Sequence, residues 1–153
     1  MTSSLDLSRR SLLVGTAAAA TVSRAARAQA RPIRVGVLTD LSGPYRDTGG
    51  PTSVAAARQA MEDFAAAGNT MPVEIVSADH QQKPDVAVGI AREWFDRGGV
   101  DAVVDVNNSA IAFAVTDLAQ QRDTVQLNTG AFSADIAGIR CSPNQVHWGS
   151  DSW

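Results

Sequence analysis

The sequence lacks most of the residues on which covalent and metal chemistry depend. Its 153 residues include one cysteine, Cys141, and two histidines, His80 and His147. A single cysteine excludes an internal disulfide, and no histidine or basic cluster stands near Cys141 in the sequence to make it reactive. The HExxH, HxxxH, GxSxG, P-loop and GxGxxG motifs are absent as well. The sequence therefore predicts no catalytic residue, no metal site and no cofactor.

Long apolar runs are also missing. The run Leu12–Ala20 is shorter than the roughly 20 residues that a membrane span needs. It follows the pair Arg9–Arg10 and precedes "AQA" at Ala28–Ala30, which is the charged, apolar and small-residue order of an export signal. The segment "SRRSLL" resembles the twin-arginine signal, with Leu12 where phenylalanine is usual. We expect residues 1–30 to direct export to the periplasm and to be removed; the alternative is a disordered Arg/Ala-rich start.

Positive charge is scarce beyond this segment. The first 30 residues hold four of the 13 basic residues and one of the 16 acidic residues. Residues 31–153 therefore carry a net charge of −6. An acidic surface argues against nucleic acid and against anionic lipid as partners, so we expect neither nucleic-acid binding nor membrane insertion after cleavage.

The remaining chain alternates apolar β-branched runs with segments of helical periodicity. The expected strands cover residues 33–39, 71–78, 100–106, 124–128 and 145–148. The expected helices cover residues 52–67, 83–99 and 109–121, with a short helical turn near 134–137. This alternation predicts an α/β fold, a parallel sheet with right-handed helical crossovers in three layers.

Four polar loops, rich in turn-forming residues, follow the expected strands. They are Asp40–Gly50, Asp79–Lys83, Asn107–Ser109 and Asn128–Ser133. Ligands of open parallel sheets bind outside the carboxyl ends of the strands, where the topology switches. The loops therefore predict a small-molecule site at that edge.

Several stretches together carry a family resemblance. "IRVGVLTDLSGPYRDTGG", "VEIVSADHQQKPDVAVGIAREWFDRGGVDAVVDVNNSAIAFAV", "LNTGAFSADIAG" and "CSPNQVHWGSDSW" resemble the substrate-binding proteins of ABC transporters. The type is similar to the leucine/isoleucine/valine-binding group, with the type I periplasmic-binding-protein fold. The resemblance implies two lobes, of which residues 31–148 would be most of the first and residues 149–153 the start of the hinge and second lobe, cut off.

The resemblance also implies a function. It implies capture of a small carboxylate in the periplasm, either a branched-chain or aromatic amino acid or an aromatic acid, for an inner-membrane ABC permease and without catalysis. A first lobe alone is expected to be marginally stable and to bind weakly or not at all. A ligand-sensing module of the same fold, a non-functional fragment of a solute-binding protein, and an exported enzyme fragment are the alternatives.

At the start of the third helix, Asn108 and Ser109 are candidate ligand contacts. The resemblance implies that the Ser109 hydroxyl binds the ligand carboxylate, and the positive end of a helix suits an anion there. The alternative for Ser109 is a helix N-cap.

The other candidates lie in two loops. Gly130 permits close backbone approach, the N–H groups of Ala131 and Phe132 could face a carboxylate, and Ser133 adds a hydroxyl. The Phe132 ring suits an apolar or aromatic ligand, or it packs in the core. Tyr45 is expected to pack on the ligand.

Two further features have simpler explanations. Arg46 could pair with a carboxylate, although a solvated arginine is more common. Asp79 and His80 point to opposite faces of an extended segment, which disfavours joint metal binding.

Overall fold

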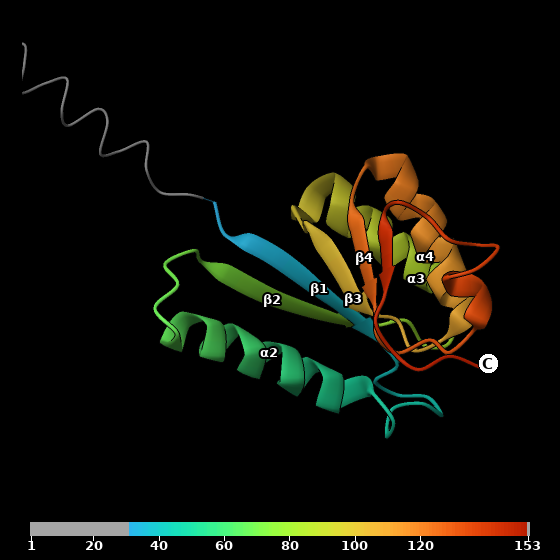
Figure 1. The fold of residues 1–153 in the computed structure, drawn as a ribbon, viewed down its shortest axis with the longest axis horizontal. Helices are drawn as coiled ribbons and strands as arrows, with labels where there is room; N and C mark the ends of the chain where they lie inside the picture. The colour runs from blue at the N-terminus through green and yellow to red at the C-terminus, as the bar shows by residue number, and fades with distance from the viewer. Residues whose placement is uncertain (1–30, 153) are drawn as a thin grey trace, which may run out of the picture. The chain divides into compact units, whose positions relative to one another are not determined.

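A computed structural model describes residues 31–152 of the chain. The predicted export signal lies outside these residues. The strands are β1 (Ile33–Thr39), β2 (Val73–Asp79), β3 (Ala102–Asp105), β4 (Val125–Asn128) and β5 (Gln145–His147). The helices are α2 (Gly50–Ala66), α3 (Pro84–Glu93) and α4 (Ser109–Arg122), with a π-helical turn at Trp94–Gly98 and a 3-10 turn at Ala134–Ile136 (Figure 1).

All five strands run parallel in one sheet, in the order β2-β1-β3-β4-β5. The chain passes from β1 to β2 on one side and then crosses to β3 on the other side of β1. The topology therefore switches between β1 and β3, as it does in doubly wound folds. The predicted α/β class with a parallel sheet and helical crossovers is confirmed.

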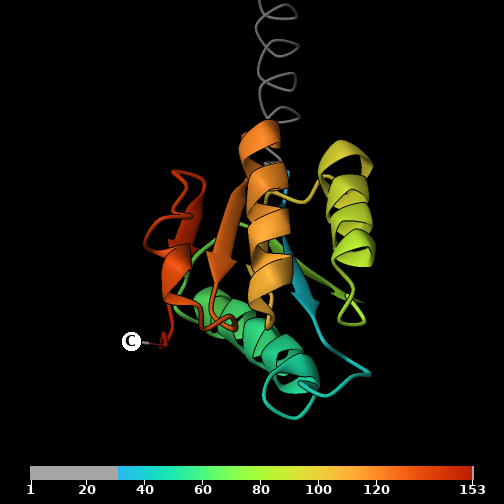
Figure 2. The ribbon, with the colours of Figure 1, turned by 90° about the vertical axis from the view of Figure 1, so that its right-hand side faces the viewer.

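The helices form the outer two of three layers. Helix α2 lies on one face of the sheet, and α3 and α4 lie side by side on the other (Figures 1 and 2). The main apolar core lies between the sheet and the α3–α4 pair. Its buried members are Leu38, Ala87, Ala91, Val100, Val103, Val106, Ile111, Ala112, Val115, Leu118, Ala131 and Ile136. This core fixes the starts of α3 and α4 relative to the strand ends.

The α2 side of the sheet is packed more thinly. Within α2, Gly50 and Val54 are the buried residues. On the strands β4 and β5, the side chains of Val125, Leu127 and Val146 are 38–44% exposed. Within residues 31–152, no helix has the length and apolar character needed to cross a membrane.

Two element ends differ from the predicted ones for reasons of backbone conformation. The third strand ends at Asp105, because Asp105 (φ 77°) and Val106 (φ 57°) are left-handed and break the extended ladder. The second helix ends at Glu93 and continues as the π-helical turn, which Gly99 closes with φ 63°.

Candidate ligand-binding site

The four polar loops meet at the carboxyl edge of the sheet, as predicted. The parallel register pairs Thr39 with Asp79, Leu38 with Asp105, and Asp105 with Asn128. The loops that follow these residues are therefore neighbours, although up to 88 residues separate them in the sequence.

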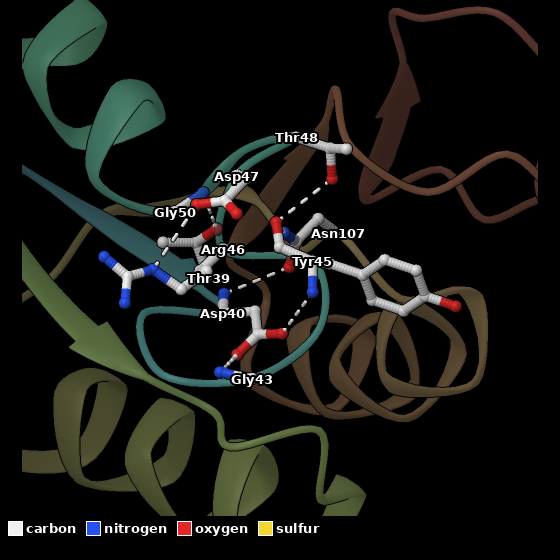
Figure 3. Close-up of polar contacts among 9 residues, drawn as sticks. All are labelled: Thr39, Asp40, Gly43, Tyr45, Arg46, Asp47, Thr48, Gly50 and Asn107. Carbon is white, nitrogen blue, oxygen red and sulfur yellow. Dashed lines mark hydrogen bonds and ion pairs between the residues drawn. The ribbon is translucent and has the colours of Figure 1, made fainter.

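The loop after β1 is held by one buried carboxylate (Figure 3). The Gly43 N–H donates to Asp40 Oδ1 at 2.7 Å, and the Tyr45 N–H and Gln82 Nε2 donate to Asp40 Oδ2 at 2.9 Å each. Burial raises the pKa of Asp40, but these hydrogen bonds outweigh it and hold the pKa below its usual range. At the end of the loop Gly50 takes φ +52°, where a Cβ would lie 2.6 Å from the Asp40 carbonyl oxygen. Asp40 therefore fixes the loop that carries Tyr45.

Asn107 joins three of the four loops. Its Oδ1 accepts from the Asp40 N–H at 3.0 Å and from His80 Nε2 at 2.9 Å, and its Nδ2 donates to the Tyr45 carbonyl at 3.2 Å. Its amide oxygen thus accepts two hydrogen bonds and its amide nitrogen donates one inside the protein. Asn107 is therefore a positioning residue at the joint between β3 and α4.

His80 and Asp79 also serve the scaffold. The Gln82 N–H donates to His80 Nδ1 at 3.1 Å, so the proton of the neutral ring lies on Nε2. Burial lowers the pKa of His80, against the opposing effects of Asn107 and nearby carboxylates. Asp79 accepts from the Ser42 hydroxyl and the Leu41 N–H. In the described part of the chain, no three metal-ligating side chains gather into a group that could hold a metal ion.

A cavity of about 460 Å³ opens beside this scaffold. It is lined by Tyr45, Thr48, Ser53, Asp105, Asn107, Asn108, Ser109, Ala110, Thr129, Gly130, Ala131 and Phe132. The loops after β1, β3 and β4 and the starts of α2 and α4 thus form its wall. The loop Asp79–Lys83 supports that wall without lining the cavity.

The start of α4 contributes both side-chain and backbone donors. Asn108 is the N-cap, because its Oδ1 accepts from the Ile111 N–H at 3.2 Å. The capping alternative for Ser109 is therefore wrong. Its Oγ accepts from the Ser133 N–H at 3.2 Å, which leaves the hydroxyl proton available for another acceptor. The N–H groups of Ser109 and Ala110, in the first turn, have no partner within the helix.

The segment after β4 differs in part from expectation. The Ala131 N–H donates to Asn128 Oδ1 at 3.0 Å, so the expectation that it faces a ligand is wrong, although Ala131 lines the cavity. Phe132 is 54% exposed and lines the cavity, so the alternative of a core position is also wrong. Ser133 does not line the cavity and acts through its N–H on Ser109.

The first loop contributes one aromatic ring. Tyr45 is 47% exposed and lines the cavity, and its ring extends away from the cluster around Asp40 (Figure 3). The Arg46 guanidinium lies 3.5 Å from the carboxylate of Asp47, and both side chains are exposed. Arg46 does not line the cavity.

Comparison with known proteins identifies the family. The model of a family described as "Periplasmic binding protein" matches residues 32–153, which is most of the chain. The chain belongs to the periplasmic binding protein family. A search of curated proteins finds no match.

Two solved periplasmic binding proteins illustrate the similarity. One, from Burkholderia mallei, is 39% identical with a TM-score of 0.74, over 78% of this chain and 32% of that one. The other is a branched chain amino acid ABC transporter periplasmic ligand-binding protein from Burkholderia xenovorans. It is 43% identical with a TM-score of 0.72, over 77% of this chain and 32% of that one. The chain spans about a third of the length of these periplasmic binding proteins.

The sequence analysis did not single out several residues that line the cavity of this periplasmic binding protein. They are Thr48, Ser53, Asp105, Ala110 and Thr129. Asp105 and Thr129 end or follow neighbouring strands, and the Thr129 hydroxyl donates to Asp105 Oδ1 at 3.2 Å. The signal that could have found them is their place at the carboxyl ends of predicted strands.

Proposed function

We propose that this chain is the ligand-binding part of a solute-binding protein serving an ABC importer, and that its ligand is a small organic carboxylate. The observation that carries the proposal is the start of α4 in the cavity wall. There the Ser109 hydroxyl and the N–H groups of Ser109 and Ala110 are available to an anion. The helix dipole adds about half a positive charge at the same place. The site contributes binding, and we propose no chemical step in it.

The rest of the cavity supports an apolar body on that carboxylate. The rings of Tyr45 and Phe132 are half-exposed and line the cavity, where they can pack against an aliphatic or aromatic group. We therefore propose a branched-chain or aromatic amino acid, or an aromatic acid, as the ligand. Asn108, Gly130 and Ala131 shape the wall, and Ser133 positions Ser109.

The setting of this function is also a proposal. Membership of the periplasmic binding protein family and the export pattern predicted in residues 1–30 support a periplasmic location and an inner-membrane ABC permease as partner. Fractionation of cells that express the chain tests the location.

Titration of the chain with L-leucine, L-phenylalanine and benzoate, followed by amide NMR shifts, tests the binding. We expect weak, saturable binding with the largest shifts at Ser109 and Ala110. Ser109→Ala should weaken it roughly tenfold, because a hydrogen bond to a charged group contributes about 1.5 kcal/mol. Ser77→Ala, at an exposed position of β2, is the matched control. Saturable binding that Ser109→Ala leaves unchanged would contradict the assignment of the carboxylate to α4.

A further inference from the structure

Asp105, at the end of β3, has a buried oxygen that the described protein leaves without a hydrogen bond. The residue is 5% exposed and lines the cavity. Its Oδ1 accepts from the Thr129 hydroxyl at 3.2 Å, whereas its Oδ2 has no hydrogen-bond partner. Buried polar atoms are nearly always paired, so an unpaired carboxylate oxygen on a residue that lines a cavity points to a partner from outside.

Two glycines border this carboxylate and keep side chains away from it. A Cβ at Gly130 would lie 2.6 Å from Asp105 Oδ1. A Cβ at Gly49 would lie 3.5 Å from Asp105 Oδ2, 3.4 Å from Ser53 Oγ and 2.9 Å from Asn107 Nδ2. The Asn107 amide already donates to the Tyr45 carbonyl. Asp105 and Ser53 both line the cavity, and the absence of a Cβ at Gly49 leaves their oxygens uncovered on that side.

The backbone at Asp105 is held in an uncommon conformation. Asp105 and Val106 both have positive φ, which is costly for side chains with a Cβ and especially for a β-branched valine. The Asp105 carbonyl accepts from the N–H groups of Thr129 and Gly130 at 3.4 and 3.3 Å. These contacts fix the carboxylate against the loop after β4.

The charge of the cavity favours a particular kind of ligand. No lysine or arginine lines it, and no ion pair joins Asp105 to a basic side chain in residues 31–152. Among residues 31–152, Asp105 supplies the only carboxylate in the cavity wall, which gives the cavity a formal charge of −1. A plain organic anion would add a second negative charge to the cavity. A zwitterion would instead place a positive charge beside the Asp105 carboxylate.

We propose that the Asp105 carboxylate, through Oδ2, binds a primary ammonium group of the ligand. This inference rests on the proposed function, in which the ligand carboxylate binds the start of α4. It narrows the ligand class to an amino acid and excludes simple aromatic or aliphatic acids as preferred ligands.

Three probes with one carbon skeleton test the inference: L-phenylalanine, L-3-phenyllactate and 3-phenylpropanoate. L-3-Phenyllactate has a hydroxyl in place of the ammonium group of L-phenylalanine, and 3-phenylpropanoate has a hydrogen there. Titrated into the chain and followed by NMR, L-phenylalanine should bind at least tenfold more tightly than 3-phenylpropanoate, with L-3-phenyllactate between them. L-leucine and 4-methylpentanoate repeat the comparison with an aliphatic side chain.

The variant Asp105→Asn removes the charge and keeps an acceptor for Thr129. We expect it to lose at least tenfold in affinity for L-phenylalanine and to bind 3-phenylpropanoate within about twofold of the unmodified chain or more tightly. Asp47→Asn, an exposed acid in the loop after β1, is the control and should change neither affinity. If Asp105→Asn does not fold, the three probes titrated into the unmodified chain still test whether the ligand's ammonium group contributes to binding.

The outcomes separate this inference from the proposed function. Equal affinities for L-phenylalanine and 3-phenylpropanoate would overturn the ammonium subsite and leave carboxylate binding intact. L-3-phenyllactate binding as tightly as L-phenylalanine would also overturn it, because a neutral donor would then suffice. If no probe of either series binds, both proposals fail.

Discussion

Asp40 and Asp105 are two buried aspartates at the carboxyl ends of neighbouring strands, and their hydrogen bonding differs sharply. Asp40 follows β1 and accepts three hydrogen bonds, from Gly43, Tyr45 and Gln82, with both oxygens occupied. Asp105 ends β3, and within residues 31–152 its side chain accepts one hydrogen bond, on Oδ1, while Oδ2 accepts none. The same residue type therefore has two different hydrogen-bonding environments at one edge of the sheet.

The difference distinguishes side chains that hold the loops together from side chains that we propose bind the ligand. The joint between β3 and α4 shows the same contrast, because both polar atoms of the Asn107 side chain have hydrogen-bond partners inside the protein, whereas the Ser109 hydroxyl keeps its proton to donate. Internally satisfied groups contribute to stability, and unsatisfied groups in a cavity wall contribute to binding. Substitutions at the two kinds of position should therefore change different measured quantities.

The largest effect is expected for Asp40→Asn. The amide NH₂ would face the N–H of Gly43 or Tyr45, and the remaining hydrogen bonds would lose the charge of their acceptor. Hydrogen bonds to charged groups contribute about 1.5–3 kcal/mol each, so we expect the free energy of unfolding at pH 7 to fall by about 3 kcal/mol. Urea unfolding followed by circular dichroism measures it.

The pH dependence of this effect has a definite sign. The pKa of Asp40 is lower in the folded chain than its ordinary value of 3.8. Its stabilisation is therefore full above pH 3.8 and is lost as the pH falls through the pKa of the folded chain. The free energies of unfolding of the unmodified chain and of Asp40→Asn, plotted against pH, should therefore converge in acid. Asp47→Asn, exposed and paired with Arg46, should change stability by less than about 0.5 kcal/mol. If the Asp40→Asn chain were as stable as this control, the Asp40 carboxylate would not stabilise the fold, and the contrast with Asp105 would be refuted.

A methyl group at Gly130 should have the next largest effect. Its Cβ would lie 2.6 Å from Asp105 Oδ1 and 2.8 Å from Asn107 Cβ, so it would clash with both side chains and displace one of them. We expect Gly130→Ala to lower the midpoint of thermal unfolding and the free energy of unfolding by about 2 kcal/mol. Gly89→Ala is the matched control, because nothing lies within 4 Å of the new methyl group and alanine favours helix α3 by about 0.5–1 kcal/mol. Equal stability changes in the two variants would show that the wall is not tightly packed.

His80 should give the scaffold a measurable sensitivity to mild acid. Burial keeps its pKa in the folded chain below the ordinary value of 6.5. The unfolded chain therefore binds more protons below pH 6.5, and stability should fall as the pH is lowered through that value, by at most about 1.4 kcal/mol per pH unit. His80→Gln can still donate to Asn107 Oδ1 and should flatten this slope between pH 7 and pH 5. An unchanged slope in thermal unfolding across this range would assign the sensitivity to other groups.

Local sequence signals were enough to predict most of the fold. The apolar run Ile33–Thr39 is β1 residue for residue, and α3 begins at Pro84, one residue after the predicted start. Such signals depend on a few adjacent residues, namely apolar periodicity and the restricted backbone of proline and glycine. The left-handed conformation at Asp105 and Val106 depends instead on contacts with the loop after β4, so the end of β3 was predicted too late.

The candidate site was predictable only to the extent that it follows strand ends. Tyr45, Ser109 and Phe132 stand in polar loops, and all three line the cavity. The partner of each polar atom could not be read from the sequence, because the partners come from other loops. The His80–Asn107 hydrogen bond spans 27 residues. For the same reason the unoccupied oxygen of Asp105 went unnoticed, since an unpaired atom is recognised only when every neighbour is known.

Among the substitutions of buried residues, Asp105→Asn, which matches Asp40→Asn, should change stability least. The Oδ1 acceptor of Thr129 is retained, and the oxygen that is replaced accepts no hydrogen bond in the described chain. The free energy of unfolding should therefore change by less than about 1 kcal/mol, although the residue is only 5% exposed. Urea unfolding at pH 7, run beside Asp40→Asn, measures the contrast. A loss near 3 kcal/mol would mean that Oδ2 has a partner within the free protein, such as a bound water molecule. The carboxylate would then belong to the scaffold, and the ground for an ammonium subsite at Asp105 would be removed. A small loss together with altered ligand preference would show that this carboxylate is retained for binding.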